Sequence, residues 1–448
     1  MTARSKNSFA FSAAASASAL LYVYLAIVSR TYADATLIDA AVVYGGALLA
    51  VAALALATRP DAEIDWPLLF GWAVVLRLLA FATYPVLEDD FFRYLWDGAQ
   101  TLAVGTPYGM APADAFDVVA RDAAADPAAA VLDGINHPEL PTVYGPTLQL
   151  LFAGSNVLAP WALWPLKLAA LLADLAVLRL LWLLAPGRAC WWWALCPLLL
   201  KEFATTAHPD VLGAACLVIG LWAYDRGRPA ALGVSVGLAL GIKPFALLFA
   251  PFLLLRRPRA WPWCLATLLG LTLCFAPASS PVAVWLPGGL EAMAQGWTFN
   301  APLHRLGAWL GLPATLTARG LLTAYAAIWA AALWRQWREP ERQPVPALLW
   351  LMGLFWLVTP VLNPWYLVWW LPLAVLRPAA TPWIAAAAVL LSYGAPINTG
   401  EFPLQAPAEY LYAVPGWLLV AQLALVGVGL WLDRRRARYS PPAVRSSL

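Results

Sequence analysis

Runs of apolar residues near 20 in length recur along almost the whole chain, and they constrain its fold more than any other feature. A helix needs about 20 apolar residues to cross a bilayer core, where each backbone polar group must be satisfied within the segment. The predicted spans are 10–28, 38–57, 66–84, 162–184, 189–200, 210–224, 260–277, 313–334, 346–360, 364–376, 380–394 and 411–432. Residues 146–160 are apolar but short, and 230–255 are interrupted by Lys243-Pro244. The sequence therefore predicts an all-α, polytopic membrane helix bundle of about 12–15 helices, in a single integral membrane domain.

Composition excludes other classes of chain. Of the 448 residues, 62% are hydrophobic and 12% are charged. In a typical soluble domain about 45–50% of the residues are apolar and about 25% are charged. The net charge of +3 is too small for a nucleic-acid partner at this length. The five cysteines all lie in apolar segments, which indicates buried packing residues rather than a disulfide set or a metal site.

Arginines and lysines gather in short loops, which the positive-inside rule places in the cytoplasm. They precede the first span, separate later spans and end the chain: Arg4, Lys6, Arg226, Arg228, Arg256, Arg257, Arg259, Arg335, Arg338, Arg342, Arg434, Arg435, Arg436 and Arg438. Counting spans from the N-terminus places the loop 85–145 outside. Counting back from the C-terminus agrees if 230–255 is a hairpin with both ends inside and 146–160 does not fully cross. The alternative is that both segments cross.

The external loop 85–145 carries ten acidic residues, and its first part has helical spacing. Four polar residues at i, i+3, i+4 and i+7 share one helix face: Asp90, Arg93, Tyr94 and Asp97. The opposite face is apolar: Phe91, Phe92, Leu95 and Trp96. The pattern predicts an amphipathic helix in the membrane interface that presents its carboxylates at the end of a span. Arg93 and Asp97 are expected to pair at i, i+4.

Glu88, Asp89 and Asp90 are three consecutive acids beside a membrane span. A solvated acidic loop with an interfacial helix is the simplest interpretation of such a run. Repulsion among three neighbouring carboxylates is unfavourable, however, unless a cation, a base or a substrate donor relieves it. A carboxylate with a raised pKa in this position would suit a general base.

Motifs along the chain match, in order, those of a known family. In the external loop they are Glu88 to Gly98, Gly105-Thr106-Pro107-Tyr108 and His137 to Pro146. Further along they are Lys201-Glu202-Phe203, His208-Pro209-Asp210, Lys243-Pro244, Phe299-Asn300 and Asn363-Pro364-Trp365-Tyr366. Together with the topology, they resemble membrane glycosyltransferases of the C-type fold (GT-C), in particular the bacterial polyprenol-phosphate-mannose-dependent mannosyltransferases. The resemblance covers roughly residues 70–380.

The resemblance implies an architecture and a reaction. Residues 66–380 correspond to a GT-C-like core that includes the loop 85–145, residues 1–65 add two N-terminal spans, and 381–448 form C-terminal spans and a basic cytoplasmic tail. The donor would be a hexose, with mannose favoured, on a polyprenyl phosphate. The acceptor would be a lipid-linked glycan, a lipid or a protein, and transfer would invert the anomeric centre. The implied location is a bacterial inner (plasma) membrane, among membrane lipids, with the active site outside the cytoplasm.

The resemblance also implies which carboxylate acts as the base. The family's catalytic aspartate lies three residues before an arginine, which corresponds to Asp90, with Asp89 and Glu88 as alternatives. Three departures from the family pattern bear on the acceptor and the sugar more than on the reaction: Phe92 in place of an aromatic hydroxyl, Gly145 in place of the first proline of a Pro-Pro pair, and Pro209 in place of a small polar residue.

Other residues of these motifs are expected to bind substrate. In the external loop they are Arg93, Tyr94, Asp97, Tyr108, His137 and Tyr144. Beyond it they are Lys201, Glu202, His208, Asp210, Lys243, Asn300, Arg305, Asn363, Trp365 and Tyr366. The basic members suit the donor phosphate, and Glu202 or Asp210 suit sugar hydroxyls. Simpler roles stay open: Asp210 at a helix N-terminus, Lys243 snorkelling to the interface, and Arg305 in a surface pair.

A metal ion is left open. His137, His208 and His304 fall in predicted external loops, where they would be available to join acidic residues around a divalent cation, Mg²⁺ or Mn²⁺. No close ligand spacing in the sequence supports such a site.

Two other functions account for part of the sequence. A membrane transporter or lipid flippase would explain broken helices and the intramembrane Lys167 and Asp174, but the chain shows no inverted repeat. A noncatalytic subunit of an envelope assembly would explain the apolar chain but not the clustered acids. Glycosyl transfer is therefore the function that we expect.

Overall fold

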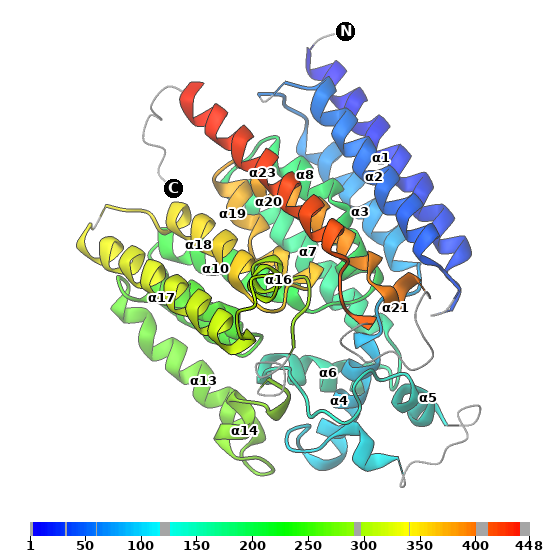
Figure 1. Ribbon diagram of the computed structural model, residues 1–448, viewed down its shortest axis with the longest axis vertical. Helices are drawn as coiled ribbons and strands as arrows, with labels where there is room; N and C mark the ends of the chain where they lie inside the picture. The colour runs from blue at the N-terminus through cyan, green and yellow to red at the C-terminus, as the bar shows by residue number, and fades with distance from the viewer. Residues whose placement is uncertain are drawn as a thin grey trace. The chain divides into compact units, whose positions relative to one another are not determined.

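The computed structural model describes residues 3–31, 34–59, 61–116, 126–290, 297–339, 341–399 and 411–439. Within these residues the chain is helical without strands, and an isolated parallel bridge joins Phe299 and Val361 (Figure 1). The predicted all-α fold is thereby confirmed. The chain forms two units, of which the first comprises Met1–Leu87, Leu175–Thr205 and Thr298–Leu448. The second comprises Glu88–Asp174 and Thr206–Trp297.

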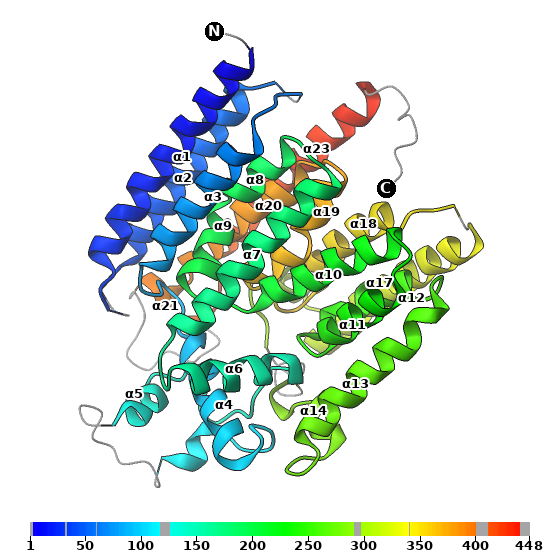
Figure 2. The ribbon, with the colours of Figure 1, turned by 180° about the vertical axis from the view of Figure 1, so that it is seen from behind.

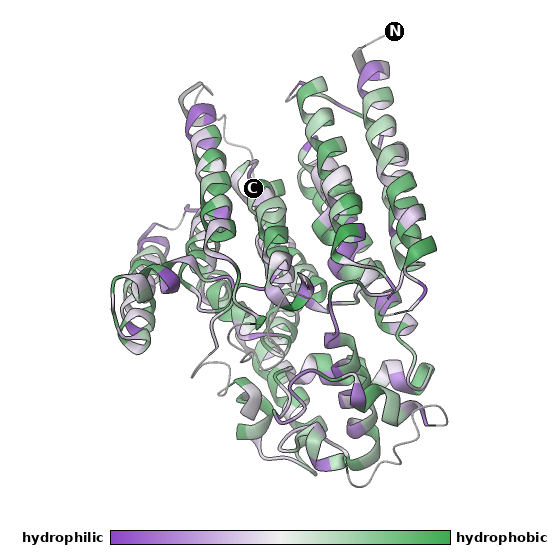
Figure 3. Ribbon diagram, turned by 45° about the vertical axis from the view of Figure 1, so that its right-hand side comes forward, coloured by the Kyte–Doolittle hydropathy of each residue, from purple (hydrophilic) through white to green (hydrophobic). Residues whose placement is uncertain are grey.

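Helices that can cross a membrane confirm the predicted multi-pass topology. Four in the described part of the chain are long and apolar enough: α1 (Ala3–Val28), α2 (Leu37–Ala57), α17 (Ala314–Arg338) and α23 (Gly416–Tyr439). A fifth results if Ala189–Thr205 and Asp210–Asp225 count as one broken span. Large hydrophobic side chains such as Leu49, Leu322 and Val420 are exposed along them, as lipid contact requires. Figure 3 shows that hydrophobic residues predominate along the long helices.

Several of the predicted spans are instead shorter apolar helices, of 10–17 residues: Trp66–Phe81, Pro229–Leu240, Pro344–Val358, Pro364–Leu376 and Thr381–Gly394. Proline stands in the first turn of each of them. Because proline has no N–H to donate and cannot continue a preceding helix, it divides apolar runs that look continuous in the sequence.

The described residues of the first unit form helices joined by loops. They are α1, α2, α3 (Trp66–Phe81), the second half of α7 (Trp164–Leu184), α8 (Ala189–Leu195), α9 (Pro197–Leu199), the π-helical η2 (Leu200–Thr205), α16 (Pro302–Trp309), α17, α18 (Pro344–Val358), η5 (Pro364–Trp369), α19 (Leu371–Leu376), α20 (Thr381–Ala388), η6 (Val389–Gly394), α21 (Pro396–Thr399) and α23. Helix α1 lies beside α2 and α3, and α20 packs against α23 (Figures 1 and 2).

Arg77 of α3 is fully buried in the first unit, where it compensates for a broken helix. Its guanidinium donates hydrogen bonds to the carbonyl oxygens of Trp193 and Ala194, at 3.2 and 2.5 Å. In an uninterrupted helix the Trp193 carbonyl would accept from residue 197, but Pro197 has no N–H. Arg77 therefore donates to a carbonyl that has lost its helical N–H donor at the break between α8 and α9. Such a replacement is essential where water is scarce.

Asp433, near the end of α23, caps the start of α20. Its carboxylate accepts hydrogen bonds from the backbone N–H groups of Ala380 and Thr381, at 2.6 and 3.0 Å, and from the Thr381 hydroxyl, at 2.6 Å. The first N–H groups of a helix have no partner within the helix, and a negative charge there is also favoured by the helix dipole. One carboxylate thus ties α23 to α20.

The described residues of the second unit also form helices joined by loops. Its elements are α4 (Asp90–Val104), η1 (Pro112–Ala115), α5 (Pro127–Asp133), α6 (Pro146–Leu158), the first half of α7, α10 (Asp210–Asp225), α11 (Pro229–Leu240), η3 (Pro244–Leu248), α12 (Ala250–Leu254), η4 (Pro258–Ala260), α13 (Trp261–Phe275) and α14 (Pro281–Trp285). Helix α4 ends at Gly105, whose φ of 80° is the left-handed conformation that favours glycine.

The segment 230–255 doubles back on itself within the second unit. Helix α11 has 12 residues, about 18 Å at 1.5 Å per residue, which is too short to cross a bilayer core of about 30 Å. The chain then turns at Lys243-Pro244 and returns through η3, α12 and η4, which contact α11. The carbonyl of Ala260 lies beside Gly233, close to where α11 begins. The arrangement is the hairpin that one of the two sequence interpretations predicts.

Helices α4 and α6 of the second unit approach each other closely at Gly98. A Cβ built on Gly98 would lie 2.4 Å from the carbonyl oxygen of Phe152, a backbone atom that cannot move aside without shifting α6. Glycine is therefore required for this approach, which sets the distance between α4 and α6.

We predict that Gly98→Ala destabilises the protein by about 1–3 kcal/mol, because overpacking of a close contact forces a backbone shift. Thermal unfolding of the detergent-solubilised protein, followed by the fluorescence of its 26 tryptophans, measures the effect. Gly154→Ala on α6 is the matched control, since no atom lies within 4 Å of a Cβ built there. The control should be neutral or slightly stabilising. Equal melting temperatures for Gly98→Ala and wild type would contradict the close-packing argument.

Candidate active site

Polar side chains of the second unit converge around the N-terminus of α4. They come from the start of α4, from the segment 136–144 before α6, from the residues that precede α10 and begin it, and from Lys243 before η3. The backbone brings two of these segments together, because the N–H of Thr147 donates to the carbonyl of Gly241 at 2.9 Å. A Cβ on Gly145 would lie 2.4 Å from that same carbonyl oxygen. Gly145, a departure from the family pattern, is thus the residue that permits the approach.

Asp90 is the first residue of α4 and accepts hydrogen bonds from two side chains of the segment 136–144. The hydroxyl of Tyr144 donates to its Oδ2 at 3.2 Å, and the Asn136 amide donates to Oδ1 at 3.4 Å. Burial raises the pKa of Asp90 above its ordinary value, although Asn136, the positive charge of Lys243 and Tyr144 act in the opposite direction. Asp90 therefore has the raised proton affinity that the sequence predicts for a general base.

Asp89 lies beside it and has a different partner. The Asn136 amide donates to its Oδ1 at 2.5 Å. Burial, and then the neighbouring charge of Asp90, raise the pKa of Asp89 to about 6. The repulsion among consecutive acids that the sequence suggests is therefore real at this pair, and a single amide side chain bridges both carboxylates.

Asp97 is buried within α4 and anchors the segment that follows. Its carboxylate accepts hydrogen bonds from three side chains: Arg93 at 2.8 Å, Thr142 at 2.5 Å and Gln149 at 2.9 Å. The predicted Arg93–Asp97 pair is confirmed, and Arg93 also donates to the carbonyl of Leu140 at 2.9 Å. Asp97 is 1% exposed, so it acts on the site by holding the segment 140–149 against α4.

The helix predicted at the interface is therefore packed on both faces. Phe91, Leu95 and Trp96 of the apolar face are buried as expected, but Arg93 and Asp97 of the polar face are buried as well. The polar face contacts α6 and the preceding segment rather than water. Helical spacing identified which residues share a face, whereas the contacts that cover the polar face come from residues far along the chain.

Lys243 and Asp210 form a buried ion pair next to Asp90. The Lys243 Nζ lies 3.0 and 2.9 Å from the two carboxylate oxygens of Asp210. Asp210 is the first residue of α10, where the helix dipole favours a negative charge. The pair explains why a lysine stands at the break in 230–255: it neutralises Asp210 and places a positive charge near Asp90.

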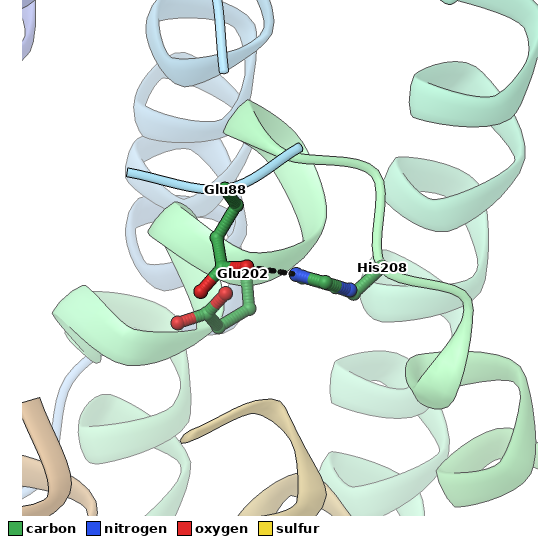
Figure 4. A group of neighbouring side chains, drawn as sticks. All are labelled: Glu88, Glu202 and His208. Atoms are coloured by element: carbon green, nitrogen blue, oxygen red, sulfur yellow. Dashed lines mark ion pairs between the residues drawn. The ribbon is translucent and has the colours of Figure 1, made fainter. Parts of the chain in front are cut away.

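His208 joins Tyr94 and Glu88 on the other side of the α4 N-terminus. Its Nδ1 lies 2.8 Å from the Tyr94 hydroxyl, and its Nε2 lies 3.9 Å from Glu88 Oε2. Figure 4 shows the imidazole edge directed at the Glu88 carboxylate. Glu202, the third residue drawn there, belongs to the first unit.

Tyr108 and His137 complete the residues predicted from the external loop. Tyr108 packs against Phe275, and its hydroxyl donates to the carbonyl of Tyr144 at 3.3 Å. His137 has a φ of 48°, lies 3.3 Å from Glu139 and meets the ring of Trp297 at 4.6 Å. Tyr108 therefore holds the backbone of Tyr144 in place. His137 directly follows Asn136 in the sequence. The loop residues 117–125 lie outside the described residues.

Lys201 and Glu202, on the π-helical η2 of the first unit, form a cluster with Tyr393 in which each residue contacts the other two. Lys201 donates to the Tyr393 hydroxyl at 2.6 Å, and that hydroxyl donates to Glu202 at 2.8 Å. Lys201 also lies 3.2 Å from Glu202 and 4.0 Å from the Tyr393 ring centroid. Both charged side chains are fully buried, so within the first unit each stabilises the charge of the other.

The later predicted motifs also meet within the first unit. Backbone hydrogen bonds of 2.9 Å join Phe299 to Pro360 and Leu362, which brings Asn300 beside Asn363. Asn300 donates to the Leu362 carbonyl at 3.3 Å and accepts from Gln422 at 2.9 Å. The remaining contacts are Asn363 with the Tyr366 hydroxyl at 3.3 Å, Trp365 with the Tyr366 ring at 5.8 Å, and Arg305 with the Val414 carbonyl at 3.5 Å.

Sequence reasoning missed four residues of these clusters: Asn136, Thr142, Gln149 and Tyr393. Asn136 directly precedes the His137 motif and Thr142 lies within it, so the motif itself gave a signal for both. Gln149 is a polar residue within an apolar run, which is a weaker signal. Tyr393 lies in a run typical of any apolar helix and gave none.

We predict that Asp89→Asn stabilises the protein at pH 8 but not at pH 4. The raised pKa, about 6, means that the folded protein binds this proton more tightly than the unfolded chain. The resulting stabilisation is complete below the unfolded pKa of about 4 and is lost as the pH rises through 6. Asparagine removes this dependence, so the melting temperature at pH 8 should rise by about 2 °C. Asp133→Asn, an exposed acid at the end of α5, is the control, and an unchanged Asp89→Asn melting curve at pH 8 would refute the prediction.

Comparison with known proteins agrees with the expected family. Residues 5–258, from α1 through α12, match the family described as alpha-(1->6)-mannopyranosyltransferase, N-terminal domain. Alpha-(1->6)-mannopyranosyltransferase A of Mycobacterium tuberculosis (strain ATCC 25618 / H37Rv) is 26% identical over 343 residues, which cover 68% of this chain and 64% of that relative. No solved structure shows a significant match. Because the family match extends over more than half of the sequence, the chain belongs to the alpha-(1->6)-mannopyranosyltransferase family.

Proposed function

We propose that the protein is a membrane glycosyltransferase that moves a hexose, with mannose favoured, from a polyprenyl-phosphate-linked donor to a hydroxyl of a lipid-linked glycan, lipid or protein acceptor. The reaction takes place on the extracytoplasmic side of a bacterial inner membrane. Family membership and the membrane-spanning helices support this assignment. The relative from Mycobacterium tuberculosis carries a mannosyltransferase name, which favours mannose.

The observation that carries the proposal is the setting of Asp90. A general base must be ionised while it waits for substrate and basic enough to take a proton in the transition state. Burial raises the pKa of Asp90, while Tyr144, Asn136 and Lys243 keep its ionised form accessible. An acid with this balance, at the start of a helix beside a lysine, is suited to deprotonating an acceptor hydroxyl.

The reaction proceeds by a single displacement. The acceptor hydroxyl gives its proton to Asp90 while its oxygen attacks the anomeric carbon from the face opposite the phosphate. The bond between that carbon and the phosphate oxygen breaks, and the polyprenyl phosphate leaves with the electron pair. Configuration at the anomeric carbon inverts. The Lys243 ammonium, held by Asp210, stabilises the negative charge that develops on the phosphate.

We favour Asp90 over Asp89 and Glu88 because of the Tyr144 hydroxyl that donates to it and the positive charge of Lys243 beside it. Asp89 instead accepts the shorter hydrogen bond from Asn136, at 2.5 Å. Glu88 faces His208.

We predict that Asp90→Asn lowers transfer by at least about 100-fold, the lower end of the contribution of a general base. Membranes that contain each variant are incubated with radiolabelled polyprenyl-phosphate mannose and a lipid-linked acceptor, with Mg²⁺, Mn²⁺ or EDTA. Asp89→Asn should retain more activity than Asp90→Asn. Asp133→Asn, an exposed acid of the same loop, is the matched control and should behave as wild type.

Each outcome of this assay is informative. Transfer by Asp90→Asn at the wild-type rate would overturn the assignment of the base. No transfer by wild type with any polyprenyl-phosphate sugar would overturn the proposed function. Movement of the labelled lipid across the membrane without a new glycosidic bond would indicate the transporter or flippase alternative.

We also predict an acidic limb in the pH dependence of kcat/KM that lies above the ordinary aspartate pKa of about 4. Activity falls as the pH drops, because protonated Asp90 cannot act as a base. Lys243→Met should move the limb to higher pH, since the variant loses a positive charge that lowers the pKa of Asp90 and leaves Asp210 uncompensated. Lys243→Arg should keep it in place, and Lys6→Met, at the exposed start of α1, is a second control. An unmoved limb in Lys243→Met would contradict the electrostatic argument.

A further inference from the structure

Tyr144, Tyr94, His208 and Glu88 form a continuous row of side chains that leads away from Asp90. Resting on the function proposed above, we infer that this row is a proton relay, which carries off the proton that Asp90 takes from the acceptor hydroxyl and delivers it to His208 and Glu88. All five residues belong to the second unit.

The contacts along the row are close. The Tyr144 hydroxyl donates to Asp90 at 3.2 Å, and the rings of Tyr144 and Tyr94 meet edge to face at 5.2 Å. The Tyr94 hydroxyl lies 2.8 Å from His208 Nδ1, and Glu88 lies 3.9 Å from Nε2. A movement of Glu88 by about 1 Å closes the last step to hydrogen-bonding distance.

The row is polarised in the direction of transfer. The Glu88 carboxylate accepts only, so it favours the tautomer of His208 that carries its proton on Nε2. Nδ1 is then an acceptor, and the Tyr94 hydroxyl must donate to it. The oxygen of Tyr94 is left to accept a proton from Tyr144. Once Asp90 is protonated, Tyr144 can turn from donating to Asp90 to donating to Tyr94, because a protonated carboxyl donates.

Proton transfer then balances along the row. The proton on Asp90 passes to the Tyr144 oxygen as the Tyr144 proton passes to Tyr94 and the Tyr94 proton passes to Nδ1 of His208. The imidazolium gives its Nε2 proton to Glu88, which releases it. Asp90 is again ionised and both tyrosines are neutral, while His208 is left with its proton on Nδ1. Before the next turnover, both hydroxyls and the imidazole ring must turn, so that an unprotonated ring nitrogen again faces Tyr94.

Burial explains why a route through the protein is useful. Tyr94 is 1% exposed and His208 is fully buried, so neither exchanges protons with bulk water directly. Both substrates must lie against Asp90 during the reaction, which excludes water from its carboxyl. Within the second unit, His208 meets the Tyr94 hydroxyl at Nδ1 and the Glu88 carboxylate at Nε2. Glu88 is therefore a proton acceptor within reach of the imidazole.

The relay predicts that Tyr94→Phe slows repeated turnover but not the first. Phenylalanine keeps the ring that stacks on Phe152 at 4.9 Å and removes only the hydroxyl that the relay uses. In rapid-quench assays at low buffer concentration, the first turnover should match wild type, because Asp90 starts ionised. The steady-state kcat should fall by about tenfold, below the full contribution of a general base. Added imidazole should restore most of the loss by carrying the proton itself.

His208→Gln is the second variant, since glutamine keeps a hydrogen-bonding side chain that cannot carry a proton. It should show the same intact first turnover and the same rescue by imidazole. Thr101→Val, which removes a hydroxyl bonded to the Asp97 carbonyl on the same helix, is the matched control and should resemble wild type. A merely structural defect would lower the first turnover or the amount of inserted protein, and imidazole would not correct it.

The outcomes separate the relay from the proposed function. Wild-type kcat for Tyr94→Phe at low buffer, or a loss that imidazole does not relieve, would overturn the relay while leaving the role of Asp90 intact. If His208→Gln fails to insert into the membrane, the result with Tyr94→Phe decides. An intact first turnover in Asp90→Asn would instead overturn the assignment of the base on which the relay rests.

Discussion

The buried carboxylate of Asp97 is the interaction on which the second unit depends. A carboxylate taken out of water is costly unless hydrogen bonds replace its hydration, and Asp97 has three such donors: Arg93, Thr142 and Gln149. Two of these donors lie in or after the segment that precedes α6. The cost of leaving Asp97 unsatisfied therefore fixes this segment against α4, and it is the same segment that carries Asn136 and Tyr144 to Asp90. Burial of the polar face of α4 therefore positions the residues that contact Asp90.

The same rule governs the other charges inside this apolar chain. Lys243 neutralises Asp210, Lys201 pairs with Glu202, and Arg77 satisfies carbonyls at a helix break. Each case joins a charge to a place where a helix begins or is interrupted by proline or a π-helical turn. In an environment with little water, irregular backbone needs internal partners, and buried charges need partners of their own. In these three places a buried charge therefore marks an irregular element of the backbone.

The sequence predicted the parts of the fold and site that depend on local spacing. Helical periodicity identified α4 and its Arg93–Asp97 pair, and the apolar runs identified a multi-pass all-α chain. What covers the polar face of α4 was not predictable, because Gln149 reaches Asp97 across 52 residues and spacing carries no information on such contacts. Tyr393 reaches Lys201 across 192 residues for the same reason. Apolar runs also look continuous across prolines that in fact end helices, so shorter and broken helices replaced several expected spans.

Three neighbouring acids acquire three different chemical settings, and these settings are the ground on which we propose one of them as the base. Glu88 faces an imidazole, Asp89 accepts a short hydrogen bond from an amide, and Asp90 accepts from a tyrosine hydroxyl near a lysine. Burial raises the pKa of both Asp89 and Asp90, so burial alone does not select the base. The distinction lies in what each partner can do once a proton arrives. An amide can only continue to hold Asp89, whereas a hydroxyl can reverse its hydrogen bond and accept a proton from Asp90. We therefore propose Asp90 as the base, because its tyrosine partner can take part in both the arrival and the departure of a proton.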